Sequence, residues 1–139
     1  MKDITIFINE SNNNKFDLTK LYNVISKNGD SYTFKDIVNE IENNTDTLNK
    51  KKINKIFKGF EKSEFVCITI PERGEIQDIW GDTWGTESYV DVLPNYEEIG
   101  TSDDIGEINI ASGIDKNNIF IAMIESVDGD YNLCCLTKK

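Results

Sequence analysis

The chain has 139 residues, of which 38% are hydrophobic and 29% are charged, and its formal net charge is −10. This length predicts a single domain with its own core, and the charge disfavours general affinity for nucleic acid or for an anionic membrane surface. The sequence contains no histidine. Cys/His zinc sites, histidine general bases and Ser-His-Asp triads are therefore excluded.

The sequence shows no recognisable signal for membrane insertion or secretion. No run approaches the roughly 20 apolar residues of a membrane span, and the N-terminus does not have the pattern of a signal peptide. The three cysteines, Cys67, Cys134 and Cys135, lie in apolar runs without a CxxC motif. We expect reduced core thiols in a protein that is not secreted through a signal peptide and does not associate with membranes.

Residues 1–10 read MKDITIFINE and fit two kinds of structure. Ile4, Ile6 and Ile8 alternate as in an edge strand, whereas Ile4, Phe7 and Ile8 fit one face of a first helix. The periodicity alone does not choose between the two. The polar segment 11–15, SNNNK, favours a turn, so we expect 1–10 to be a leader or an edge strand and 16–139 to be the domain.

This N-terminal segment resembles the capsid-targeting leaders of T-even-type tailed bacteriophage proteins. Those leaders begin with Met-Lys, carry apolar residues at helical spacing and close with Glu. The prohead protease of that family cuts after Leu/Ile-x-Glu, and Ile8-Asn9-Glu10 matches this site, with Ser11 following the cut. The resemblance implies a virion-associated protein delivered to the host cytoplasm, with Glu10 as the candidate cleavage site. Packaged proteins of that group are typically basic, and this chain departs from them in being acidic.

Three amphipathic helices are predicted after the leader. Asp17 is a candidate N-cap for the first, which Gly29 ends, and Thr33 and Asp36 resemble a capping box at the start of the second. Apolar residues then recur at i, i+3, i+4 and i+7. They are Leu18, Leu21, Tyr22 and Ile25 in the first helix, Phe34, Ile37, Val38 and Ile41 in the second, and Ile53, Ile56, Phe57 and Phe60 in the third.

The strand-like segments follow, at 64–70, 88–93, 105–110, 118–125 and 131–136. Segment 118–125 is apolar nearly throughout, which predicts a central strand buried on both faces. Asp128-Gly129 predicts a hairpin that pairs it with 131–136. We expect this hairpin and 64–70 to form the sheet centre, with 88–93 as the next strand. The predicted fold is α+β, with about three short N-terminal helices packed on a largely antiparallel sheet of four to five strands.

The stretch 72–115 holds twelve acidic residues and one basic residue, Arg73, so it carries nearly all of the net charge. Acidic residues steer a basic partner toward a surface, and aromatic residues anchor it there. The competing interpretation is that one of the two tryptophans, Trp80 and Trp84, fills the end of the core and the other covers a loop, while the carboxylates belong to a solvated acidic loop. No carboxylate spacing is specific to a calcium loop or to acid/base catalysis, so we expect no catalytic residue, no metal and no cofactor. The candidate partner-binding residues are Asp78, Trp80, Asp82, Trp84, Glu87, Tyr89, Tyr96, Glu97, Glu98, Asp103 and Asp104.

These patterns favour a small acidic phage-type accessory protein that binds and inhibits a basic host protein, such as a defence or nucleic-acid-binding factor. A second hypothesis is a winged-helix DNA-binding regulator, in which 64–70 is a wing strand and Lys51, Lys55 and Lys58 contact phosphates. A structural virion component and a toxin-immunity protein are further alternatives. The interpretation that we prefer for the lysines is a solvated face on a core helix, and we do not expect nucleic acid to be the partner.

Overall fold

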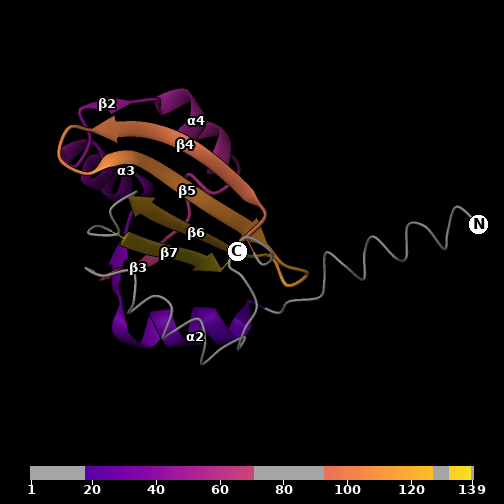
Figure 1. Ribbon diagram of the computed structural model, residues 1–139. Helices are drawn as coiled ribbons and strands as arrows, with labels where there is room; N and C mark the ends of the chain where they lie inside the picture. The colour runs from indigo at the N-terminus through magenta and orange to yellow at the C-terminus, as the bar shows by residue number, and fades with distance from the viewer. Residues whose placement is uncertain (1–17, 71–92, 127–131, 139) are drawn as a thin grey trace, which may run out of the picture.

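The computed structural model describes residues 18–70, 93–126 and 132–138 (Figure 1). The helices are α2 (Thr19–Asn28), α3 (Phe34–Asn43) and α4 (Lys50–Ile56). The strands are β1 (Asp30–Tyr32), β2 (Thr47–Leu48), β3 (Phe65–Ile70), β4 (Asn95–Ser102), β5 (Gly106–Ile114), β6 (Ile119–Ser126) and β7 (Asn132–Lys138).

The strands form one antiparallel sheet in the order β1-β3-β7-β6-β5-β4-β2. The α+β class, the N-terminal helices and the antiparallel sheet are confirmed. The sheet in the described part of the chain has seven strands, however, and not the four to five that we expected. The additional ones are the very short β1 and β2 and the acidic β4, none of which the sequence pattern predicted.

The centre of the sheet agrees with the prediction. β6 is buried along its whole length, and it pairs with β7, which in turn pairs with β3. The predicted strand at 88–93 lies outside the described residues except for Leu93, which is buried but is not in a strand. The neighbour of β6 on its other side is β5.

Helices cover both faces of the sheet, which explains why β6 is buried on both sides. α2 packs on one face, against β3, β6 and β7, while α3 and α4 lie over the other face (Figure 1). Alternate residues of β6 therefore enter two separate cores. Phe120, Ala122 and Ile124 belong to the core under α3 and α4, and Ile119, Ile121 and Met123 to the core under α2.

Phe57 is the centre of the core under α3 and α4. It is fully buried, and its ring lies 5.3 Å from that of Phe34, 5.6 Å from Phe65 and 5.5 Å from Phe120, between centroids. These tilted and edge contacts are the arrangements that aromatic rings prefer. The cluster therefore joins α3, α4 and the sheet into one core.

The helix ends follow the predicted signals in part. Thr33 and Asp36 form the reciprocal capping box of α3, as predicted. Gly29 ends α2 with an extended backbone, and a Cβ there would lie 2.8 Å from the Cys67 carbonyl oxygen, so glycine permits a close approach to β3. The third helix is shorter than predicted: α4 ends at Ile56, and Phe60 reaches the core from beyond Gly59. Asp17, the predicted N-cap of the first helix, lies outside the described residues.

Candidate functional site

The candidate site is built on the β4–β5 hairpin, whose two faces carry different residues. Tyr96 pairs with Ala111 and Glu97 with Ile110. Residues opposite each other in a sheet share a face, and Ala111 belongs to the core under α2 whereas Ile110 belongs to the core under α3 and α4. Tyr96 therefore points to the α2 side of the sheet, and Glu97 points to the side of α4.

Negative charge is displayed along this hairpin. Residues 93–115 contain six acidic residues and neither lysine nor arginine. Four of the six are exposed and lie on β4, on β5 or in the turn between them: Glu98, Asp103, Asp104 and Glu107. Backbone hydrogen bonds hold that turn, because the Asp103 N–H donates to the Asp46 carboxylate and the Asp104 N–H donates to Ser102 Oγ at 3.3 Å.

Asp115 also belongs to the acidic stretch but has a structural role. Its side chain is only 8% exposed. One carboxylate oxygen accepts the Leu18 N–H at 2.9 Å, and the other accepts the N–H groups of Asn117 and Ile119 at 2.9 and 3.0 Å. Asp115 therefore fixes the β5–β6 turn against the start of α2, and its charge is not available to a partner.

Two lysines of α4 contact β4, and one of them pairs with an acidic side chain on the opposite side of the hairpin. Lys55 Nζ lies 3.5 Å from Glu97 Oε1, and Lys52 Nζ donates to the Glu98 carbonyl oxygen at 3.1 Å. Lys51 and Lys58 are exposed. Among the residues that the structure describes, the exposed hairpin carboxylates that no lysine pairs with are those in the turn and on the α2 side. The segment proposed as a wing strand is β3, which lies inside the sheet between β1 and β7, so the arrangement of a winged helix is not formed there.

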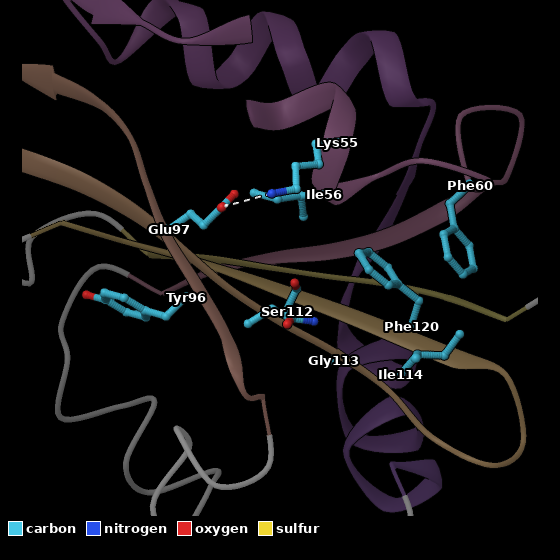
Figure 2. Close-up of a pocket in the computed structure, with 10 residues that line it drawn as sticks. Lys55, Ile56, Phe60, Tyr96, Glu97, Ser112, Gly113, Ile114 and Phe120 are labelled. Carbon is cyan, nitrogen blue, oxygen red and sulfur yellow. Dashed lines mark ion pairs between the residues drawn. The ribbon is translucent and has the colours of Figure 1, made fainter. Parts of the chain in front are cut away.

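A groove of about 320 Å³ lies between α4 and the hairpin (Figure 2). At one end Glu97 reaches toward Lys55. At the other end the rings of Phe60 and Phe120 stack with centroids 4.6 Å apart. Ile114 lines the apolar part and remains 51% exposed. Such a groove suits one apolar side chain that has a charged neighbour.

Exposed aromatic surface occurs at the edge of this groove, which Tyr96 also lines. The Tyr96 side chain is 45% exposed and points away from Glu97 and Lys55 (Figure 2). In the described residues only two other large hydrophobic side chains, Val24 and Ile114, have comparable exposure. An exposed tyrosine among carboxylates has the composition of an interface anchor.

Five of the eleven predicted partner-binding residues lie along β4 and in the turn that follows it, and they are divided between the two faces of the sheet. Tyr96 and Glu98 lie on one side of β4 and Glu97 on the other, with Asp103 and Asp104 in the turn. The remaining six lie outside the described residues, as does the candidate cleavage site, Glu10. These six are Asp78, Trp80, Asp82, Trp84, Glu87 and Tyr89.

Sequence reasoning missed a buried polar row next to this surface. Asn109, Glu125 and Asn132 lie opposite one another on β5, β6 and β7, and each is at most 7% exposed. They share the α2 side of the sheet with Glu98, which pairs with Asn109. The available signal was Glu125 itself, a carboxylate that directly follows the apolar run of β6.

Searches for related proteins add no family to these observations. No family model, no curated protein and no solved structure matches the chain. Within 18–70, 93–126 and 132–138, no group of three or more cysteine, aspartate and glutamate residues is placed to hold a metal ion. The same residues include no helix with the length and apolar character needed to cross a membrane.

Proposed function

We propose that the protein binds a basic protein partner through one surface of the β4–β5 hairpin and thereby inhibits that partner. This surface, called the hairpin surface below, consists of Tyr96, Glu98, Asp103, Asp104 and Glu107. The observation that carries the proposal is its charge: every charged side chain of 93–115 is negative, while the nearby α4 lysines engage the opposite side of β4.

The two kinds of residue in the hairpin surface have separate roles in this proposal. Exposed carboxylates raise the rate of encounter with a basic surface, an effect that salt screens. Tyr96 supplies contact area and a hydroxyl group at low conformational cost. Because an array of carboxylates presents negative charge to Lys and Arg as a phosphate backbone does, a nucleic-acid-binding protein is the partner class that we propose.

The N-terminal resemblance supplies the biological setting of the proposal. Ile8-Asn9-Glu10 matches the cleavage site of phage capsid-targeting leaders, so we place the protein among phage accessory proteins that are packaged and act in the host. An inhibitor of host defence needs a surface for its target and no chemistry of its own. The proposed mode of action is therefore binding, and the protein is proposed not to be an enzyme.

Affinity capture from bacterial lysate with a charge-matched control tests the proposal. The test variant carries Glu98→Lys, Asp103→Lys and Asp104→Lys. The control carries Asp30→Lys, Glu40→Lys and Glu64→Lys, which make the same charge change near β1 and β3, at the opposite edge of the sheet. We expect wild type and control to retain the same basic protein, the test variant to lose it, and duplex DNA to elute it.

Two results would contradict the proposal. Equal capture by all three proteins would show that the hairpin surface is not the interface. Retention of the captured protein in excess duplex DNA would show that the hairpin does not occupy a nucleic-acid site. Circular dichroism of both variants verifies that each is folded before the capture is compared.

A further inference from the structure

Two of the three cysteines face each other at the centre of the sheet. Cys67 of β3 and Cys135 of β7 are direct partners in the antiparallel register. Opposite residues of antiparallel strands have Cα atoms about 4.5 to 5.5 Å apart, which lies within the range of roughly 4.4 to 6.8 Å found for disulfides. Both residues belong to the core under α3 and α4, and, after burial, Cys67 is among the groups that raise the pKa of Cys135. The register therefore places the two cysteines on one face of the sheet, at a separation that a disulfide spans.

Cys134 is next to Cys135 in sequence but lies on the other face of the sheet. It belongs to the core under α2, and all three thiols are free and buried. Burial raises the pKa of Cys134 to about 12 and raises the pKa of Cys135 well above the ordinary thiol value. Neither thiol readily forms the thiolate that attacks an oxidant.

Cys67 differs from the other two because it lines a cavity. This cavity has a volume of about 70 Å³ and is also lined by Tyr32, Ile37, Glu40, Thr69 and Leu133. It exceeds the roughly 15 Å³ that one water molecule requires, so it has room for a peroxide molecule. Its polar groups are a hydroxyl, a phenol and a carboxylate, which solvate such a molecule. Neither Cys134 nor Cys135 lines it.

We propose that Cys67 and Cys135 are a redox-active pair that closes into a cross-strand disulfide when a peroxide enters this cavity. The Cys67 thiolate attacks one peroxide oxygen, the O–O bond breaks, and Cys67 becomes a sulfenic acid while hydroxide leaves and takes up the proton that Cys67 released. The Cys135 sulfur then attacks the Cys67 sulfur. The S–S bond forms, and the sulfenic hydroxyl leaves as water with the Cys135 proton. In total, two thiols and one hydrogen peroxide yield one disulfide and two water molecules.

The register also predicts which pairs cannot form. Cys134 lies on the face away from Cys67, so a disulfide between them would need one strand to rotate its side chain through the sheet. Cys134 and Cys135 are adjacent in an extended strand, and their side chains point to opposite faces. Oxidation therefore selects the 67–135 pair and leaves Cys134 as a thiol.

Mass spectrometry of the folded full-length chain after treatment with hydrogen peroxide tests this proposal. We expect a mass loss of about 2 Da and, after unfolding, a fall from three alkylated cysteines to one, which is Cys134. Dithiothreitol should restore all three. Because Cys134 and Cys135 fall in the same proteolytic peptide, the assignment uses two matched variants: Cys134→Ser should form the disulfide and Cys135→Ser should not.

Several results would overturn the proposal. Three alkylated cysteines after peroxide treatment would show that the pair does not oxidise. A disulfide in Cys135→Ser, or irreversible oxidation of Cys67 while Cys135 remains a thiol, would show that the two residues do not act as a pair. If one variant fails to fold, the count of alkylated cysteines in the wild-type chain still tests whether a disulfide forms.

Discussion

The Asp115 carboxylate accepts the backbone N–H of Leu18 at 2.9 Å, although the two residues are 97 positions apart. Leu18 is the N-cap residue of α2, so this bond joins the start of α2 to the β5–β6 turn. The same carboxylate also accepts the Ile119 N–H in that turn. Both donors are buried. An acidic residue from the most charged stretch of the chain thus closes the core under α2.

Removing this carboxylate is expected to destabilise the fold strongly. Asp115→Ala leaves the N–H groups of Leu18 and Ile119 without their acceptor, and we expect a loss of about 3 kcal/mol in the free energy of unfolding. Urea denaturation measures it. Asp104→Ala, which changes an exposed carboxylate in the β4–β5 turn, should shift stability by less than about 0.5 kcal/mol. Equal midpoints for the two variants would show that Asp115 does not hold this turn.

The capping box of α3 predicts a dependence on pH. Hydrogen bonds from the Thr33 backbone and then from its side chain lower the pKa of Asp36 below 3.8. Since the folded-state pKa is lower than the unfolded one, the stabilisation is complete above the unfolded value and is lost as the pH falls through the folded value. Asp36→Asn should therefore be less stable than wild type at pH 7, and the difference should shrink toward pH 3. Thermal melts at the two pH values measure this, and a difference that stays constant would refute it.

Phe57 is expected to be the most sensitive position of the aromatic cluster. Phe57→Ala removes a ring that contacts three others and leaves a cavity, which costs about 3 to 5 kcal/mol. Phe57→Leu retains most of the volume and should cost clearly less. Denaturant titration measures the free energy of unfolding of both variants. Val24→Ala, at an exposed position, is the control. A Phe57→Ala variant as stable as Val24→Ala would contradict the packing described here.

Gly100 allows β2 to reach the sheet. A Cβ at this position would lie 2.2 Å from the Thr47 carbonyl oxygen, so Gly100→Ala should displace β2 while leaving the centre of the sheet in place. Amide hydrogen exchange reports this locally, because the N–H groups of Asp46 and Asn49 donate to Thr101 and Ile99 of β4. We expect faster exchange at these two amides and unchanged exchange in β6. Unchanged protection of Asp46 and Asn49 would show that β2 tolerates the side chain.

The sequence predicted the elements that carry their own apolar periodicity. The three helices, the buried β6, its pairing with β7 and the place of β3 in the centre of the sheet were all predictable, since each of these elements buries a regular pattern of side chains. β4 was not, because it lies near the sheet edge and contributes a single fully buried side chain, Ile99, from an acidic segment. β1 and β2 are too short to have a period, and only contacts with distant residues define them.

The candidate site was predictable in composition but not in geometry. The acidic stretch and Tyr96 were evident, whereas the division of Glu97 and Glu98 between opposite faces depends on the register with β5. The pairing of Lys55 with Glu97 could not be foreseen either, because it depends on α4 packing over β4. For the same reason the row of Asn109, Glu125 and Asn132 became visible only when the strands were aligned.

Site-specific photo-cross-linking in bacterial cells tests the proposed interface most directly. Photoreactive benzoylphenylalanine replaces Tyr96 in one protein and Val24, an exposed residue of α2, in the other. We expect the probe at position 96 to cross-link one basic nucleic-acid-binding protein, more weakly at high salt, and the probe at position 24 not to do so. Cross-linking of the same protein with equal yield from both positions, or of no basic protein from position 96, would contradict the proposed role of the hairpin surface.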